Sequence, residues 1–484
     1  MRPRRRLKLR SRTGCSRCRA RHQKCDELRP SCTRCVEAGC DCVYSEGFAG
    51  LKLRAAHLAS KRPTISAGLH GTTNDLPPFL DPSHYTLLIY LVEEATSAIS
   101  CHESIRYDTS SALLCAGSNY PCFLYSGLVF AALHKVSFLR CPEAIQRVTM
   151  QILELRAKAL SMLQIELQSQ NKSDEEVVMA TALMLATCEL RYSPRHHTWR
   201  NHFEVTRRLI EQRQSSRKSQ SGDTTLSRFI DRRFNTIQFL VSLPATWAPR
   251  TSPMAFGEYC ELIPTLQTVG EIDGTMAFCR ELLDVFRLVG KIEDIKYWSA
   301  NAGDPAALMV LEYWKDIAWQ LVSIVLQMME RDIVQPPVLA ADLGETPSAQ
   351  DIEEYRALNT IAQHVALICL YHHNIGLEHC HPNVTNSVSS IVHIAAALTK
   401  RVGLHPSICL TTALFTAGCV AGEEHQDAIA ELLDVQYRVT KSQNTQVGLK
   451  LLKKLWVSAG GDTSAGMTWD NEAGKHQYFG TFLE

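Results

Sequence analysis

The chain has 484 residues, of which 45% are hydrophobic and 21% are charged, a composition typical of a folded protein. It contains no charge-free run of 18 apolar residues, and its arginine-rich start lacks the apolar stretch of a secretory signal. We therefore expect neither a membrane-spanning helix nor a secreted protein. The formal net charge of +1 conceals an asymmetry: residues 1–62 carry 17 Lys and Arg against 5 Asp and Glu, and the rest of the chain is acidic. Only the basic segment of residues 1–62 is expected to bind a polyanion.

Three segments precede the main body. Residues 1–12 form a basic arm, since seven Lys and Arg lie within residues 2–12. Residues 13–45 are a cysteine-rich module that holds seven of the 18 cysteines, and residues 46–80 have the composition of a linker. Leu51, Leu58 and Ile65 are spaced by seven, as in a coiled coil, but Pro63 interrupts the pattern. A short coiled coil is the alternative to a plain linker here.

From Asp81 onward the apolar residues recur at helical spacing, and alternating strand patterns are nearly absent. The clearest case is the amphipathic stretch 144–167. We predict a large all-α regulatory domain over residues 81–457, followed by a loose tail over residues 458–484. The predicted helices span residues 85–99, 144–167, 175–191, 198–213, 226–242, 274–296, 305–332, 350–376, 387–402, 406–420, 425–441 and 446–457.

The cysteine spacing of the module predicts a metal cluster. It consists of two matching halves, each C-x2-C-x6-C. In a reducing compartment a tight cysteine cluster binds metal rather than forming disulfides. Zinc prefers four thiolates, so two separate sites would need eight ligands where the repeat offers six. Six cysteines can give each of two Zn2+ ions four sulfur ligands if two of the cysteines bridge both ions. The predicted ligands are Cys15, Cys18, Cys25, Cys32, Cys35 and Cys42.

The segment CSRCRARHQKCDELRPSCTRCVEAGCDCVY resembles the fungal Zn2Cys6 binuclear-cluster transcription factors. The resemblance rests on the cysteine spacing, the basic stretch between the second and third cysteines, Asp26, Pro30, Gly39, and the Cys-x-Tyr ending. It implies a small zinc-cluster module with two short helices, in which Cys15 and Cys32 are the bridging ligands. Cys40 departs from the pattern, and we interpret it as a spare surface thiol because its use would break the match between the halves.

The basic residues of the module point to DNA. A short helix that carries Arg19, Arg21, His22 and Lys24 with no acid can enter a major groove. The resemblance implies that Arg21 and His22 meet the bases of a CGG triplet, and a guanidinium can bond guanine O6 and N7 together. His22 is a weaker candidate than Arg21 for a base contact, because an unperturbed imidazole has a pKa of about 6.5 and is mostly neutral at cell pH. The predicted phosphate contacts are Arg17, Arg19, Lys24 and Arg34.

The stretches DPSHYTLLIYLVEEAT and ALMLATCELRYSPRHHTWRNHFEVTRRLI resemble the helical regulatory domain of fungal transcription factors, including Glu189, Leu190, Trp199 and His202. This resemblance implies a domain that senses a ligand or holds partners, without catalytic residues. No phosphate-binding loop, nucleophile turn or H-E-x-x-H motif accompanies the histidines near residues 196–202 and 372–381, so we interpret them as surface or capping residues.

These patterns predict a nuclear, sequence-specific regulator of RNA polymerase II genes, not an enzyme, with double-stranded DNA and the transcription machinery as partners and no membrane association. The chain would bind as a monomer or form a homodimer through its body. The basic arm would act as a nuclear import signal, as a contact to the DNA backbone, or as both. The alternatives are a zinc-stabilised nuclear adaptor without base readout, and a helical enzyme with a zinc-binding appendage.

Overall fold

The computed structural model describes residues 17–18, 21, 23, 25–26, 32–38, 40, 77, 79–168, 175–192, 198–215, 224–243, 264–302, 305–340, 347–398, 404–440 and 442–459. The chain divides into two compact units, one of residues 1–80 with 140–144 and one of residues 81–139 with 145–484. The predicted basic arm, most of the predicted linker with its heptad-spaced Leu51, Leu58 and Ile65, and the tail after residue 459 lie outside the described residues.

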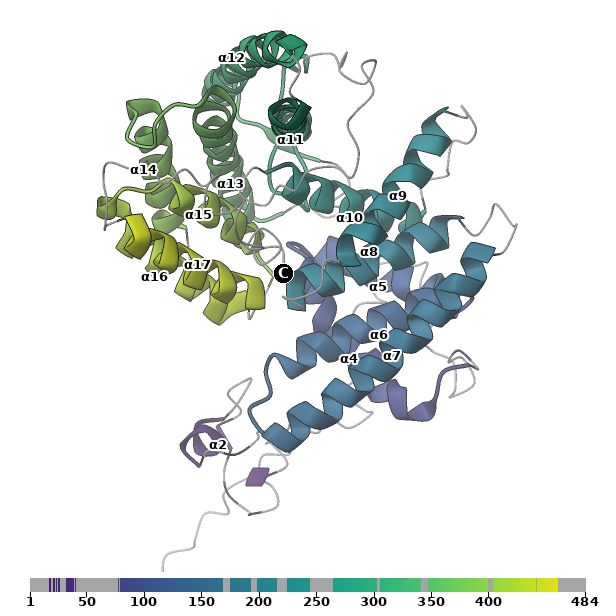
Figure 1. The fold of residues 1–484 in the computed structure, drawn as a ribbon. Helices are drawn as coiled ribbons and strands as arrows, with labels where there is room; N and C mark the ends of the chain where they lie inside the picture. Colours follow the sequence, from purple (N-terminus) through teal and green to yellow (C-terminus); the bar gives the residue numbers. More distant parts are fainter. Residues whose placement is uncertain are drawn as a thin grey trace, which may run out of the picture. The chain divides into compact units, whose positions relative to one another are not determined.

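The first unit contains a helical turn at Arg17 and Cys18 and the short helix α2 (Thr33–Glu37). The second unit begins with helices that stack on one another (Figure 1). In this part α6 packs against α4 and α8, and α8 also contacts α9 and α10. These elements are η2 (Pro82–His84), α4 (Tyr85–Glu93), η3 (Ala95–Ile99), α5 (Glu103–Cys115), α6 (Pro121–Val136), α7 (Pro142–Gln168), α8 (Glu175–Tyr192), α9 (Thr198–Ser215) and α10 (Thr225–Ser242).

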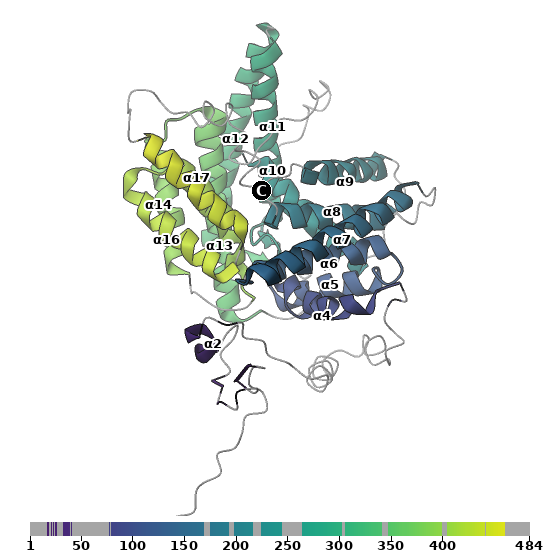
Figure 2. The ribbon, with the colours of Figure 1, turned by 60° about the horizontal axis from the view of Figure 1, so that its bottom comes forward.

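The second half of this unit is also helical and follows α10, which packs on α11 (Figure 2). Its only described strands are two residues long and form one parallel pair, in which Glu271 pairs with Val338. The all-α fold predicted for the body is therefore confirmed. The elements are β1 (Glu271–Ile272), α11 (Arg280–Ala302), α12 (Pro305–Val334), β2 (Val338–Leu339), α13 (Ala349–Ile368), η7 (Cys369–Ile375), α14 (Pro382–Ala397), η8 (Pro406–Cys409), α15 (Leu410–Cys419), α16 (Glu423–Thr440) and α17 (Gln443–Ala459).

Helices α5 and α6 were not among the helices predicted from the pattern. Helix α6 is buried on nearly every side, from Cys122 to His134. A helix that is enclosed all round has no polar face, so its sequence lacks the periodic signal of an amphipathic helix. Gly127 allows α5 to approach α6 closely, because an added Cβ at this position would lie 2.8 Å from Leu113 Cδ2 in α5. This packing makes α6 the centre of the first half of the body.

The helix predicted at residues 274–296 begins later, at Arg280. The residues before it form a turn in which the Asp273 carboxylate accepts hydrogen bonds from the backbone N–H groups of Thr275 and Met276, at 2.8 and 3.0 Å. A side chain that satisfies backbone donors in this way competes with helix formation. Ala277 follows in a left-handed conformation, with φ 62°, and ends the turn. The helical periodicity does not reveal this local bond.

Met179, Met184, Phe123 and Phe130 are at most 1% exposed and belong to the core of the body. His381 caps α14, as interpreted, because its Nδ1 accepts a hydrogen bond from the backbone N–H of Asn383 at 3.2 Å. For His373 the interpretation as a surface or capping residue is wrong, because this side chain is buried in η7. Among the described helices, none is long and apolar enough to cross a membrane.

Candidate metal centre and nucleic-acid interface

The N-terminal module is held together locally by one carboxylate and a short helix. Helix α2 starts directly after Cys32, whose side chain makes no capping hydrogen bond. Instead, the Asp26 Oδ2 accepts a hydrogen bond from the backbone N–H of Thr33 at 3.0 Å, and so occupies the start of the helix. At the other end, the N–H of Cys40 donates to the carbonyl of Cys35 at 3.0 Å. These bonds fix the direction in which Cys32 and Cys35 present their sulfurs.

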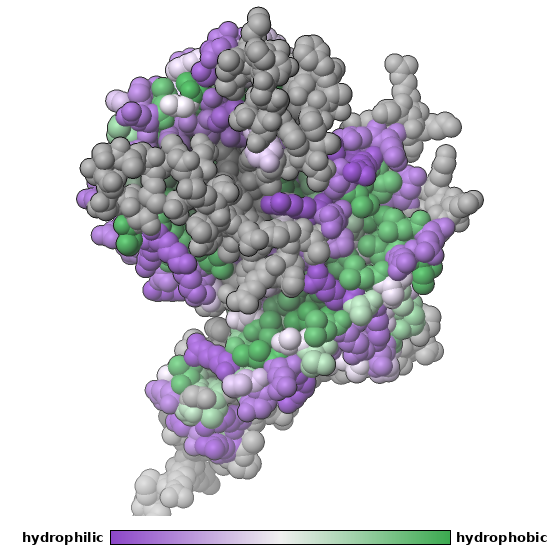
Figure 3. Space-filling view, viewed as in Figure 1, coloured by the Kyte–Doolittle hydropathy of each residue, from purple (hydrophilic) through white to green (hydrophobic). Residues whose placement is uncertain are grey.

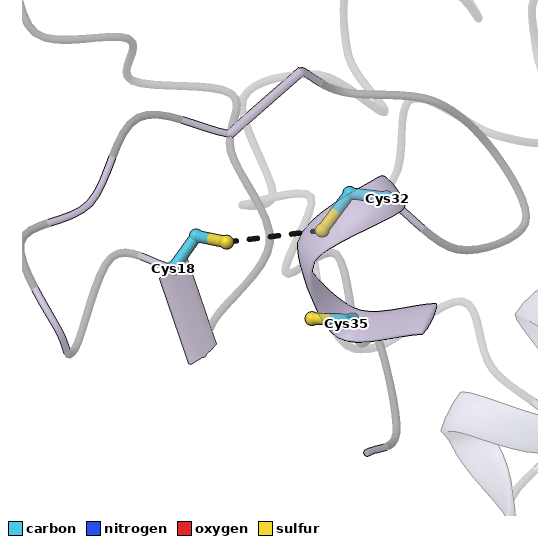
Figure 4. A group of neighbouring side chains, drawn as sticks. All are labelled: Cys18, Cys32 and Cys35. Atoms are coloured by element: carbon cyan, nitrogen blue, oxygen red, sulfur yellow. Dashed lines mark hydrogen bonds between the residues drawn. The ribbon is translucent and has the colours of Figure 1, made fainter. Parts of the chain in front are cut away.

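Four described cysteines converge in the interior of the module. Cys18, Cys25, Cys32 and Cys35 are each at most 5% exposed and form a cluster. Figure 4 shows the sulfur of Cys18, from the helical turn, facing the sulfurs of Cys32 and Cys35, from α2 and the residue before it. In the notation of the predicted repeat, these are the second, fourth and fifth cysteines. The fold therefore brings both halves of the repeat to one place.

The distance between the sulfurs is that of two ligands of one metal ion. The Sγ atoms of Cys18 and Cys32 lie 3.7 Å apart. A disulfide would require about 2.05 Å. Two sulfurs at tetrahedral positions around zinc, each with a Zn–S bond of about 2.3 Å, are about 3.8 Å apart. The donor chemistry and the spacing both fit zinc.

Cys32 belongs to two groups of possible ligands. Its sulfur lies within 4.8 Å of the sulfurs of Cys18 and Cys35, and also within 4.8 Å of the Cys25 sulfur and an Asp26 oxygen. A thiolate placed between two groups can be shared by two metal ions. Cys32 is one of the two bridging positions that the resemblance implies. The other, Cys15, and the remaining predicted ligand, Cys42, lie outside the described residues.

The electrostatics of the cluster involve Arg17. Its Nη1 donates to the Cys35 sulfur at 3.8 Å and to the Arg34 carbonyl at 3.3 Å. The hydrogen bond to Cys35 raises the pKa of Arg17 above its ordinary value. The guanidinium is charged at any physiological pH, so it brings a positive charge to the sulfurs. This places a positive charge where deprotonated thiolates need it. Arg17, which is also a predicted phosphate contact, is thus placed to compensate the negative charge of the cluster.

Cys40 is exposed, and its thiol donates to the carbonyl of Ala38 at 3.0 Å. Among the described residues, neither group of possible metal ligands includes it. The structure thus gives Cys40 a place on the surface of the module, apart from Cys18, Cys25, Cys32 and Cys35. This arrangement agrees with its interpretation as a spare surface thiol.

The predicted DNA-contacting residues fall partly within the described residues. Arg21 is exposed, and its backbone N–H donates to the carbonyl of Arg17 at 3.0 Å, which continues the helical turn of Arg17 and Cys18. Arg34 is exposed on α2. Arg19, His22 and Lys24 lie outside the described residues. Asp26 is a structural residue whose capping role was not predicted. Its signals in the sequence were its acidic side chain upstream of α2 and its place in the family resemblance.

Comparisons with known proteins cover both parts of the chain. The family described as "Fungal specific transcription factor domain" matches residues 86–478, and the family described as "Fungal Zn(2)-Cys(6) binuclear cluster domain" matches residues 13–49. No solved structure matches the chain.

Several curated fungal proteins are similar to limited stretches of the chain. The Zn(2)-C6 fungal-type transcription factor afumD of Aspergillus fumigatus is 65% identical over 34 residues, which are 7% of this chain and 9% of that protein. The transcription activator AMTR1 of Alternaria alternata is 38% identical over 63 residues, 13% of this chain and 8% of that protein. The transcription factor FUP7 of Fusarium proliferatum is 34% identical over 74 residues, 14% of this chain and 29% of that protein. The chain thus spans less than a third of each relative.

Proposed function

Because the chain belongs to the family of fungal specific transcription factors and carries a Zn(2)-Cys(6) binuclear cluster domain, we propose that it binds double-stranded DNA sequence-specifically and regulates RNA polymerase II genes in the nucleus. The family is one of transcription regulators, not of enzymes. The observation that carries the proposal is the position of Cys32 between two groups of ligands, because a shared thiolate organises a two-metal module.

The module would hold two Zn2+ ions, each bound by four sulfurs. Cys15 and Cys32 would be shared between the ions, and the other four cysteines would complete the two tetrahedra. In support, the 3.7 Å separation of the Cys18 and Cys32 sulfurs has the value of two ligands on one zinc. Arg17 would offset part of the negative charge that six thiolates leave on the two ions.

The cluster would place a short basic helix in the major groove. Arg21 is exposed one helical turn after Arg17, and its guanidinium would bond guanine O6 and N7 in a CGG-like half-site, with His22 beside it. Exposed Arg34 would contact phosphate, together with Arg19, Lys24 and Arg17. Phosphate contacts set the register of the module, and base contacts set its specificity.

The other parts of the chain would serve regulation. The basic arm over residues 1–12 would act in nuclear import, in backbone contacts, or in both, since it carries a dense positive charge. The helical body would transmit regulation to the transcription machinery and would allow the chain to act as a monomer or a homodimer. Ligand sensing by the body remains an expectation from the family.

A matched pair of variants in the full-length protein tests the two kinds of contact. A selection from random duplexes should enrich GC-rich half-sites. Arg21→Ala should cost about 1–3 kcal/mol of binding free energy at the selected site and relax the preference at one base position. Arg34→Ala should weaken binding to all duplexes alike and reduce the salt dependence by about one phosphate contact. A wild-type protein without any preference among duplexes would favour the adaptor alternative.

A further inference from the structure

Two cysteines from distant parts of the helical body place their thiols side by side. Cys101 lies between η3 and α5 in the first half of the body, and Cys409 is the last residue of η8, directly before α15 in the second half. Their sulfurs are 3.7 Å apart, although the two residues are separated by 308 positions in the chain. The fold therefore creates a thiol pair that the spacing of cysteines in the sequence does not reveal.

A single carbonyl group holds both thiols in place. Cys101 and Cys409 each donate a hydrogen bond to the carbonyl oxygen of Thr275, at 3.4 Å. Thr275 belongs to the turn before α11, and the buried Tyr355 hydroxyl donates to the carbonyl of Gly274 in the same turn, at 2.9 Å. The turn is thus fixed by its own contacts. Because the two thiols share one acceptor, their sulfurs are held close to each other.

A buried cation acts on both sulfurs. Arg233 on α10 is 5% exposed, and its Nη2 donates to the carbonyl of Ile99 at 3.0 Å. Among the described residues Arg233 forms no ion pair, and its Nε is buried without a hydrogen-bond partner. Burial lowers the pKa of Arg233 to about 10, so the group is still charged at neutral pH, and its charge interacts with Cys101 and Cys409. A buried charge without a counter-charge is costly, and a thiolate at either sulfur would supply one.

The two thiols differ in their access to solvent. Cys101 is 4% exposed, whereas Cys409 is only partly buried. The hydrogen bond with Cys409 and then burial raise the pKa of Cys101, and the charge of Arg233 opposes this rise. At rest Cys101 is therefore a protonated thiol, and Cys409 is the sulfur that a small oxidant can reach. A reachable thiol beside a second, resolving thiol is the usual arrangement of a redox-sensitive cysteine pair.

Two simpler interpretations of the pair do not fit. Among the described residues, the groups of three or more possible metal ligands all belong to the N-terminal module, so the pair lacks the further ligands of a zinc site. Exposure by itself is also uninformative. Hydrophobic residues lie at the surface of the body among hydrophilic ones (Figure 3), and Cys115 and Cys380 are exposed as well. Cys101 and Cys409 are distinguished by a neighbouring sulfur, a shared acceptor and a buried cation.

We propose that Cys101 and Cys409 form a reversible disulfide when the protein meets hydrogen peroxide. The Cys409 sulfur attacks the peroxide, so an S–O bond forms, the O–O bond breaks, and the leaving oxygen departs as water with the thiol proton. The Cys101 sulfur then attacks the resulting sulfenic acid, so the S–S bond forms, the S–O bond breaks, and the second oxygen leaves as water with the proton of Cys101. Two thiols and one peroxide thus give one disulfide and two water molecules.

The disulfide ties the two halves of the body to each other. The sulfurs approach from 3.7 Å to about 2.05 Å, and the Thr275 carbonyl loses both S–H donors because a disulfide has none. Oxidation is thereby coupled to the turn that leads into α11. In a reducing compartment the resting pair is a dithiol, and a disulfide there is transient, as in redox sensing. The chemistry goes beyond DNA binding and needs neither zinc nor DNA.

Peptide mapping of the full-length protein by mass spectrometry tests the modification. Reduced protein is treated with hydrogen peroxide, its remaining thiols are alkylated under denaturing conditions, and it is digested without reduction. The Cys101–Cys409 linkage should be at least about tenfold more abundant than any other linkage between cysteines of the body, and dithiothreitol should remove it. Cys409→Ser should abolish the linkage, whereas the matched control Cys380→Ser, which removes an exposed thiol, should keep it. A wild-type chain in which this linkage is absent, or no more abundant than others, would overturn the proposal.

A second measurement tests the positioning role of Arg233. Arg233→Met should slow formation of the linkage at least about threefold at neutral pH, because no positive charge then stabilises a thiolate at the pair. Arg233→Lys keeps the charge and should recover most of the wild-type rate, which a purely structural role of the guanidinium would not predict. Circular dichroism should show equal helix content in both variants. A wild-type rate in Arg233→Met would overturn the role of Arg233 in the chemistry.

Discussion

Replacing Cys32 with serine removes the one described sulfur that belongs to both groups of metal ligands. The Cys32 side chain is fully buried, and helix α2 begins at the next residue. A serine hydroxyl stays protonated at neutral pH and is not a zinc ligand of the usual kind. Each structural zinc contributes about 10–16 kcal/mol of apparent folding free energy in small zinc modules. Since Cys32→Ser removes a ligand from both ions, we expect the module to lose its fold.

The effect on DNA affinity follows from the loss of the folded module. Specific protein–DNA complexes are typically about 10³-fold or more tighter than non-specific ones. Cys32→Ser should therefore reduce affinity for the selected duplex by about 10³-fold at fixed salt, to the level of non-specific binding. Fluorescence anisotropy with a labelled duplex measures this loss, and a chromogenic zinc chelator measures the metal released on denaturation. Helix content should be nearly unchanged, because the body is a separate compact unit.

Cys40→Ser is the matched control, because Cys40 is in the same module and its thiol is exposed. This variant should keep its zinc and its affinity for the duplex within about twofold, as expected of a surface substitution. If Cys32→Ser kept both metal and duplex affinity, Cys32 would not be a shared ligand. If Cys40→Ser lost zinc, the assignment of the ligands would be wrong.

Three further predictions concern the stability of the body. Burial, followed by the charge of Arg191, lowers the pKa of His134 to about 3, so the unfolded chain binds this proton below about pH 6.5 and the folded chain does not. His134 should thus contribute about 2 kcal/mol to the fall in stability between pH 7.5 and 5 in urea titrations, beside the contributions of the other buried histidines, and His134→Gln should abolish that share. Arg156→Met removes the arginine that forms an ion pair with the buried Glu189 carboxylate, 2% exposed, and should cost about 3–5 kcal/mol in the same assay, most of it recovered when Glu189 is replaced by Gln as well. Gly127→Val brings a Cβ to 2.8 Å from Leu113 and should cost about 1–3 kcal/mol, seen as a lower Tm; an unchanged Tm would mean that α5 and α6 can separate at no cost.

The metal centre is the part of the protein that could be predicted best from the sequence, for a chemical reason. Ligand number and spacing follow from the preference of zinc for four sulfurs, so Cys18, Cys25, Cys32 and Cys35 could be assigned to one cluster without a fold. The capping role of Asp26 was not accessible in this way. It depends on where α2 starts in space, and a lone acid a few residues upstream carries no such information.

In the body, helices α8 and α12 lie within a few residues of the predicted ranges 175–191 and 305–332. Helix α6 is enclosed on nearly every side, which weakens its periodic pattern, and it was missed. Helix α8 is also buried from Val177 to Leu190, so burial alone does not decide which helices the pattern reveals. For α7 the helix was predicted from apolar residues at helical spacing, of which Leu155, Ala159 and Leu163 are buried and Leu167 is exposed. Which apolar residues of this helix face the core is known only from the structure.

The central claim is that the N-terminal cysteines bind a pair of zinc ions through shared sulfurs. Native mass spectrometry of the full-length protein, purified without added metal, tests this claim most directly by counting the bound ions. The account predicts two zinc ions per chain, both lost together in Cys32→Ser and both kept in Cys40→Ser. A single ion in the wild-type chain, or a folded module without any metal, would contradict it.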